Sequence, residues 1–194
     1  MLRNTNNVIQ ANLMTGIFLV RHGEAAASWG DHPDPGLSEL GKAQAEAVAR
    51  DLQALGARQA LTSPMQRCRE TARPFEQATG MSADVVSEVS EIATPEDVTD
   101  RVTWLQGFMA GSWDVEGAAH VDWRARMLDR LRLVPDGTAV FTHFVAINAI
   151  VSALQCSSST VVFRPGHCSV TTLSTTGGVL KLQELGSESA TRVL

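Results

Sequence analysis

The sequence is poor in lysine and carries no net positive charge. Its basic residues are 14 Arg and 2 Lys, and 21 acidic residues give a formal net charge of −5. Nucleic acids and anionic membrane surfaces require a broad basic surface, so we expect neither as a partner. Any anion-binding site must then be local. Arginine grips phosphate oxygens in pairs, although a genome that favours arginine codons produces the same ratio.

Cysteine is also scarce, and the chain opens without a long apolar run. Cys68, Cys156 and Cys168 are widely spaced and form no CxxC pair, which argues against a disulfide framework and a zinc site and favours a reducing compartment. Residues 1–16 hold no apolar stretch of the length that a signal peptide or an anchor needs. We therefore expect a cytoplasmic protein.

Length and composition predict one folded domain. The chain has 194 residues, of which 44% are hydrophobic and 19% charged. Strand-like and helix-like apolar periodicity alternate along it, which predicts a layered α/β fold. We place the domain at residues 16–186, between a flexible N-terminal segment, 1–15, and a frayed tail, 187–194.

Three apolar runs mark the candidate inner strands. Ile17–Val20 and Thr138–Thr142 are continuous runs that suit strands buried on both faces, and Ala60–Thr62 suits a shorter strand. A C-terminal meander is predicted at Thr160–Phe163, Ser169–Leu173 and Val179–Leu185.

Helix starts are predicted at three hydroxyl residues. Ser38 follows a Gly/Pro loop and stands as an N-cap for a helix that ends at Gly56. Ser63 and Thr94 are each followed by proline, which is favoured at the first helical position.

Basic and imidazole side chains follow the ends of these strands. Arg21 and His22 come directly after the first run, Arg67 lies in the first turn of the helix after the second, and His143 follows the third. Ligands bind at the carboxyl ends of parallel strands, so these residues are expected to meet. Two guanidiniums and two imidazoles suit phosphoryl transfer, in which charge on the phosphoryl oxygens must be balanced. Adjacent arginines lower the pKa of a histidine, which favours the neutral, nucleophilic ring.

Five blocks of the sequence resemble the histidine phosphatase superfamily, in the branch that includes cofactor-dependent phosphoglycerate mutase. They appear in the family's order at Leu19–Glu24, Pro35–Gly41, Ser63–Ala72, Val89–Ile92 and Val140–His143. The resemblance implies a three-layer α/β/α sandwich with a mostly parallel central sheet. It also implies a phosphatase that acts on a phosphorylated small molecule or phosphoprotein without a cofactor or a metal.

The resemblance also implies a role for each matching residue. His22 would be the nucleophile that forms a phosphohistidine, and Glu91 would donate a proton to the leaving oxygen. The phosphate clamp would be Arg21, Arg67 and His143. Glu88 competes with Glu91 for the role of acid, because the two acids lie three apart in an extended run and face opposite sides.

Two positions depart from the family's pattern. Phe144 stands where the family usually has glycine after the second histidine, and it is expected to leave its amide available to phosphate while narrowing the pocket. Ser28 stands where mutases tend to have asparagine, at a phosphate contact.

Other candidate residues admit two interpretations each. His32 and His167 lie in loops and either line the mouth of a pocket or have no role. No two histidines lie within nine positions of each other, so a metal site is not expected. A group of large apolar residues in the family's variable lid either receives an apolar leaving group or packs a helix onto the sheet. It comprises Trp104, Phe108, Met109 and Trp113.

The sequence is compatible with three functions. A phosphatase is favoured, because the segment after Glu91 is short and the family's mutases exclude water there with longer insertions. A phosphoglycerate mutase-like phosphoryl transferase is the second interpretation. An inactive phosphate-binding member of the fold is the third, since a fold alone does not establish activity. The substrate and the oligomeric state do not follow from the sequence.

Overall fold

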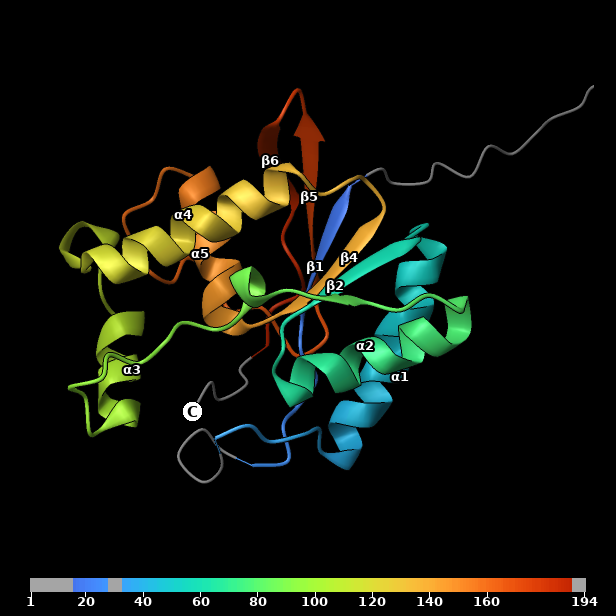
Figure 1. Cartoon of the computed structure of the whole chain (residues 1–194), viewed down its shortest axis with the longest axis horizontal. Coiled ribbons are helices and arrows are strands. Elements are labelled where there is room, and N and C mark those ends of the chain that lie inside the picture. The colour runs from blue at the N-terminus through green and yellow to red at the C-terminus, as the bar shows by residue number, and fades with distance from the viewer. Residues whose placement is uncertain (1–15, 28–32, 190–194) are drawn as a thin grey trace, which may run out of the picture.

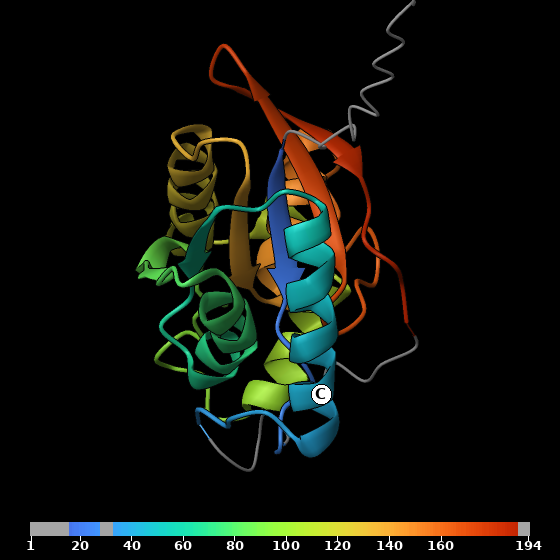
Figure 2. The same cartoon turned by 90° about the vertical axis from the view of Figure 1, so that its right-hand side faces the viewer.

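Two layers of helices enclose one central sheet in the computed structural model, which describes residues 16–27 and 33–189 (Figure 1). Helices α1 (Glu39–Ala54) and α2 (Gln66–Thr79) cover one face, and α4 (Ala118–Arg132) and α5 (Phe144–Leu154) cover the other. The view in Figure 2 shows α1 in front of the sheet. The predicted three-layer α/β/α architecture is therefore confirmed. The segment predicted to be flexible, 1–15, lies outside the described residues.

The six strands lie in the order β3-β2-β4-β1-β5-β6. The inner pairs β1–β4, β4–β2 and β2–β3 are parallel, whereas β5 and β6 are antiparallel to their neighbours, so the predicted mostly parallel sheet is confirmed. The strands are β1 (Ile17–Arg21), β2 (Gln59–Thr62), β3 (Asp84–Val85), β4 (Thr138–Thr142), β5 (Val170–Thr176) and β6 (Val179–Glu184).

The run predicted as a strand at Thr160–Phe163 does not join the sheet. The Asn148 side chain takes the hydrogen bonds that a neighbouring strand would take. Its Oδ1 accepts from the amides of Val162 at 2.9 Å and Phe163 at 3.2 Å. Satisfied backbone donors of this kind need no strand partner.

The apolar run of β1 is continuous because both of its faces are buried. Ile17 and Leu19 pack into the cluster under α4 and α5, whereas Phe18 and Val20 pack into the cluster under α1 and α2. Successive strand residues point to opposite faces, so a strand between two helical layers needs apolar residues throughout. This packing fixes the end of β1, where Arg21 and His22 follow.

Of the three predicted helix starts, the first is confirmed. The Ser38 hydroxyl accepts from the Gly41 amide at 3.0 Å, and α1 ends before Gly56, whose φ is 82°. The prediction at Thr94 is wrong, because α3 (Arg101–Met109) starts seven residues later. There the Asp100 carboxylate accepts from the Thr103 amide at 3.0 Å.

The helix start predicted at Ser63 is also wrong. Helix α2 begins at Gln66, whose amide donates to the Asp34 carboxylate at 2.9 Å. The Ser63 hydroxyl accepts from the Met65 amide at 3.3 Å and also lies 2.8 Å from His143 Nε2, so it contacts both the start of the helix and the site, while the distant Asp34 carboxylate binds the first helical amide.

Two short 3₁₀ helices complete the elements, η1 (Ser87–Val89) and η2 (Trp113–Val115). In the tail predicted to fray, Ser187 accepts from the Gly166 amide at 2.8 Å and Ser189 donates to Arg164 at 3.3 Å. Residues 190–194 lie outside the described part. Among the helices of the described residues, none has the length and apolarity required to cross a membrane.

Candidate active site

Three strand ends meet at one edge of the sheet because their hydrogen-bond ladder continues beyond the strands. The amide of His22 donates to Thr142 O at 3.0 Å, and the amide of Ser63 donates to Phe141 O at 3.0 Å. Residues that follow β1, β2 and β4 are thus held side by side. The expected meeting of His22, Arg67 and His143 takes place here.

The His22 ring has one nitrogen bound and the other directed at a cation. Nδ1 lies 2.8 Å from the carbonyl oxygen of Gly23, which can only accept, so this nitrogen carries the hydrogen. Nε2 keeps its lone pair and accepts from Arg67 Nε at 3.2 Å. Burial, and then His143, Arg67 and Arg21, hold the pKa of His22 well below its usual range. The ring is therefore neutral, and its lone pair on Nε2 is directed at the Arg67 guanidinium.

Arg67 connects the two histidines from the first turn of α2. Its side chain is buried, and Nη2 lies 3.1 Å from His143 Nδ1. If this nitrogen accepts, the hydrogen of His143 lies on Nε2, which is 2.8 Å from the Ser63 hydroxyl. Burial, and then the arginines, lower the pKa of His143 well below its usual range. Both rings are therefore neutral near pH 7.

Arg21 is buried at the end of β1 and is fixed on three sides. Nη1 donates to Pro165 O at 2.8 Å, Nη2 lies 2.9 Å from His167 Nε2, and the guanidinium sits 5.2 Å from the centre of the Phe144 ring. Burial lowers the pKa of Arg21 to about 10, so it stays charged at neutral pH. A guanidinium held in this way is oriented before a ligand arrives.

His167 belongs to the site, although the sequence left its role open. Its ring centre lies 6.0 Å from that of His22, and burial and then Arg21 lower its pKa to about 4. The neutral ring therefore accepts from Arg21. Its position after Pro165-Gly166 gave no signal that this loop folds back onto the end of β1, where the Cys168 amide donates to Arg21 O at 3.0 Å.

Phe144 lies in a different place from the one expected. Its side chain is buried in the core, and the Arg21 guanidinium packs over the face of its ring. A cation held over an aromatic face gains about 0.5–2 kcal/mol. The phosphate contact expected at Ser28 and the loop residue His32 lie outside the described residues.

Glu91 joins the site at the N-terminus of α5. Its Oε1 accepts from the Ala146 amide at 3.1 Å and its Oε2 accepts from the Val145 amide at 3.2 Å. Burial raises the pKa of Glu91, opposed by these amides and by the positive charge of Arg67. Glu88 lies in η1 and accepts from the Ser87 hydroxyl at 3.2 Å. The geometry therefore favours Glu91 over Glu88.

Arg101 is a residue that sequence reasoning missed. It opens α3, and its charge interacts with those of Arg67 and Glu91, while burial is the main cause that lowers its pKa. The sequence placed this helix start at Thr94, so Arg101 was expected inside a helix rather than at its first turn. No motif in the sequence pointed to it.

Of the lid aromatics, two are core and one lines a cavity. Phe108 and Trp113 are buried, and the Trp113 indole donates to Ser152 Oγ at 3.1 Å. Trp104 lines a cavity together with Trp123. The packing interpretation thus applies to Phe108 and Trp113, whereas Trp104 faces a cavity.

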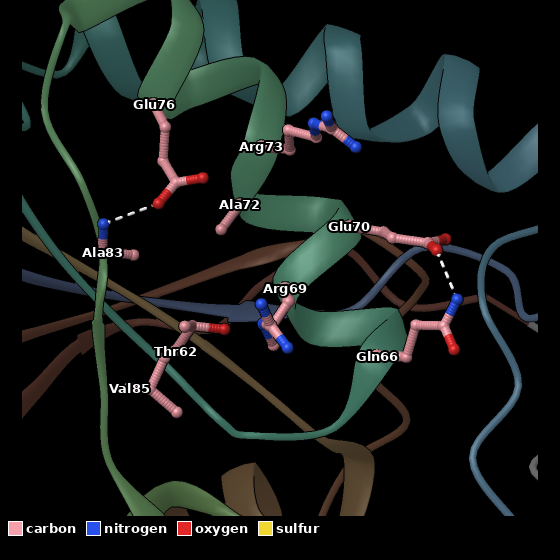
Figure 3. Close-up of a pocket in the computed structure, with 9 residues that line it drawn as sticks. All are labelled: Thr62, Gln66, Arg69, Glu70, Ala72, Arg73, Glu76, Ala83 and Val85. Carbon is pink, nitrogen blue, oxygen red and sulfur yellow. Dashed lines mark hydrogen bonds between the residues drawn. The ribbon is translucent and has the colours of Figure 1, made fainter.

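A separate hollow lies beside α2 at the β3 edge of the sheet, with a volume of about 500 Å³ (Figure 3). Its acids already have partners. Glu76 accepts from the Ala83 amide at 2.7 Å and Glu70 accepts from Gln66 at 2.7 Å. The described residues that line it include no histidine, so it lacks the nucleophile of the basic site.

Within residues 16–27 and 33–189, no group of three or more His, Cys, Asp or Glu has an arrangement that could hold a metal ion. The three cysteines are free, and Cys68 is buried with its Sγ 3.3 Å from His143 Nε2. Burial raises the pKa of Cys68, so the thiol is neutral and contributes no charge to the site.

The chain is thus an α/β sandwich with two histidines and two arginines gathered where β1, β2 and β4 end. The sequence model of the histidine phosphatase superfamily (branch 1) matches residues 17–188. The chain belongs to this family. No curated protein matches its sequence.

Solved structures with this fold include several phosphatases. A mycobacterial glucosyl-3-phosphoglycerate phosphatase with VO3 has a TM-score of 0.71 at 21% identity, covering 90% of this chain and 100% of its own. An Entamoeba histolytica phosphoserine phosphatase with 3-phosphoglyceric acid has a TM-score of 0.69 at 21% identity, and the match covers 90% of this chain and 98% of that one. An Escherichia coli putative alpha-ribazole-5'-P phosphatase has a TM-score of 0.71 at 19% identity, and the match covers 88% of this chain and 96% of that one. At these identities the likeness shows the fold.

Proposed function

We propose that this protein is a metal-independent phosphatase that hydrolyses a phosphomonoester through a phosphohistidine on His22. The observation that carries the proposal is the His22 ring, whose Nδ1 is tied to Gly23 O while Nε2 faces Arg67 Nε. Family membership supports the reaction class, and the named neighbours act on phosphorylated small molecules. The substrate is therefore proposed to be a phosphorylated small molecule.

The first half-reaction transfers the phosphoryl group to the enzyme. His22 Nε2 attacks phosphorus, the bond from phosphorus to the ester oxygen breaks, and Glu91 gives its proton to that oxygen. Arg21 and Arg67 bind the phosphoryl oxygens, so the charge that a metal would otherwise supply comes from guanidiniums. The neutral His143 completes the clamp when its Nε2 hydrogen turns from Ser63 Oγ to a phosphoryl oxygen. The raised pKa of Glu91 favours the protonated acid that this step requires.

The second half-reaction transfers the phosphoryl group to water. The Glu91 carboxylate takes a proton from water, the water oxygen attacks phosphorus, and the bond from Nε2 to phosphorus breaks. Phosphate leaves, His22 returns to the neutral state and Glu91 is again protonated.

The test measures p-nitrophenyl phosphate turnover with EDTA present, followed by acid and alkaline quench of the enzyme. We expect chelator-resistant turnover, and an adduct that acid cleaves and base preserves. The Glu91→Gln variant should accumulate this phosphohistidine adduct, because it lacks the carboxylate that takes a proton from water. His22→Ala should lose on the order of a thousandfold or more in kcat, whereas Gly107→Ala, in α3 with open space around it, should keep full activity.

Three outcomes contradict the proposal. Full activity in His22→Ala would show that His22 is not the nucleophile. Isomerisation of 3-phosphoglycerate faster than phosphate release indicates a mutase. Phosphate-competitive binding without turnover of any ester indicates an inactive binding protein.

A further inference from the structure

A cavity of about 710 Å³ adjoins the basic site at Glu91. Its size is in the range of small-molecule pockets, roughly 300–1,000 Å³. The walls come from the loop 90–96, from α3 and from α4. Among the described residues that line it, Glu91 is the one shared with the basic site.

The shared residue fixes what the cavity can hold. In the proposed function, Glu91 protonates the oxygen that joins phosphorus to the alcohol. The alcohol must therefore extend from Glu91 away from the phosphate clamp, and the cavity is the space next to that residue. This step rests on the proposed function.

The inner wall of the cavity is aromatic and held rigidly. The Trp104 ring packs 5.8 Å from Phe108 and 5.7 Å from His120, measured between ring centres. Trp123 stacks on Trp113 at 6.4 Å with an interplanar angle of 24°. Rings packed in this way cost little entropy when a ligand binds and offer flat apolar surface.

Two polar atoms of the wall, Thr94 Oγ1 and Trp123 Nε1, are buried without a hydrogen-bond partner, whereas the His120 ring has partners on both nitrogens. His120 Nδ1 lies 2.7 Å from Glu116 Oε2, and its Nε2 lies 3.3 Å from Ala93 O. The remaining charged residues, Glu96 and Arg126, are exposed and lie at the rim. Acids outnumber Arg126 around the cavity, which disfavours an alcohol that carries a carboxylate.

We propose that this cavity binds the alcohol part of an aryl phosphomonoester, or of one with a similarly bulky apolar alcohol, between Trp104 and Trp123. The leaving group is then apolar, unlike serine or glycerate.

The test compares 2-naphthyl phosphate with phenyl phosphate, since these leaving groups have similar acidity and differ by one fused ring. L-Phosphoserine and 3-phosphoglycerate serve as the anionic esters. We expect kcat/KM for the naphthyl ester to exceed that for the phenyl ester by about tenfold, as burial of extra apolar area predicts. Trp104→Ala and Trp123→Ala should reduce this ratio toward one, while Val121→Ala, exposed on α4 and not a lining residue, should leave it unchanged.

Two controls separate the outcomes. Trp104→Phe, which keeps an aromatic ring, should retain most of the naphthyl preference, and circular dichroism checks the fold of each variant. Binding of 2-naphthol to the His22→Ala variant, measured by the quenching of tryptophan fluorescence, probes the cavity without catalysis.

The results then distinguish the two proposals. Hydrolysis of phosphoserine or 3-phosphoglycerate with a higher kcat/KM than the aryl esters overturns the inference and leaves the phosphatase intact. An equal effect of Trp104→Ala on all esters also overturns it. Absence of turnover together with naphthol binding overturns the phosphatase and supports the apolar cavity.

Discussion

His167 Nε2 lies 2.9 Å from Arg21 Nη2, so a third histidine orients the first guanidinium of the site. The opposite nitrogen, Nη1, is fixed by Pro165 O at 2.8 Å. The loop between α5 and β5 thus orients the Arg21 guanidinium. An arginine binds phosphate well when its fork is oriented in advance, which makes His167 a positioning residue.

Replacement of His167 separates an acceptor role from a packing role. His167→Ala removes the acceptor, and we expect kcat/KM for p-nitrophenyl phosphate to fall about tenfold, the equivalent of one hydrogen bond to a charged group. His167→Gln places an amide oxygen near the position of Nε2 and should recover most of that loss. His167→Asn places its oxygen near Nδ1 and should not. Equal loss in the Gln and Asn variants would show that the ring acts by packing alone.

Phe144 gives a second test of how Arg21 is held. Phe144→Leu keeps an apolar side chain in the core and removes the aromatic face beneath the guanidinium. We expect an increase of about three- to tenfold in the KM for p-nitrophenyl phosphate and in the inhibition constant of inorganic phosphate, from the loss of the cation–π contact. Phe144→Trp, in turn, offers a stronger aromatic face but a larger ring.

The stability control for Phe144→Leu is the urea midpoint. A core substitution of this kind is expected to cost less than about 1.5 kcal/mol. If KM remains at the wild-type value while the midpoint falls, Phe144 supports the core and has no part in orienting Arg21.

The strands of the fold could be read from the sequence because burial on both faces leaves a continuous apolar run. Ile17–Val20 and Thr138–Thr142 carried that signal, and the residues after them, His22 and His143, were expected to meet. Arg67 was found in the same way, from the helix that follows β2. Local pattern and topology were sufficient for these residues.

The remaining site residues depend on contacts between distant segments. Ser63 has the sequence of an N-cap and accepts from the Met65 amide, but its second contact, to the His143 ring 80 positions away, has no signal in the sequence. His167 is 146 positions from Arg21, and nothing near it in the sequence indicates the contact. Arg101 was misplaced because Thr94-Pro95 has a stronger capping signal than Asp100, whose carboxylate caps α3. The contacts of Ser63 and His167 are therefore tertiary, whereas at Asp100 one local cap prevailed over another.

Protonation of the buried histidines predicts how stability depends on pH. In the unfolded chain His22 and His143 bind a proton near pH 6.5, whereas burial keeps both rings neutral in the folded protein to well below that value. Below pH 6.5 the unfolded chain therefore binds more protons, and the free energy of unfolding falls as pH is lowered. Each ring contributes at most about 1.4 kcal/mol per pH unit.

Urea unfolding at pH 7, 6 and 5 measures this dependence. We compare the wild type with His143→Gln, which cannot take up the proton, so other titrating groups such as Glu91 cancel in the difference. The variant should lose less free energy of unfolding between pH 7 and pH 5 than the wild type. Identical slopes for the two proteins would mean that His143 titrates alike in the folded and unfolded states.

Gly41 connects the packing of α1 to the loop that carries His22. A Cβ at Gly41 would lie 2.1 Å from Glu24 O, and one at Gly23 would lie 2.7 Å from Gly41 O. Alanine normally stabilises a helix interior relative to glycine by about 1 kcal/mol. At Gly41 we expect alanine to destabilise the protein instead, because the loop after His22 must move to make room for the added Cβ.

Gly107 supplies the matched control, since it also lies inside a helix but has nothing within 4 Å of an added Cβ. We expect Gly107→Ala to raise the urea midpoint and to leave kcat unchanged. Gly41→Ala should lower the midpoint and reduce kcat by tenfold or more, about the effect of a small displacement of catalytic groups. A gain of stability and full activity in Gly41→Ala would show that the loop tolerates the shift, and that the close approach of α1 does not position His22.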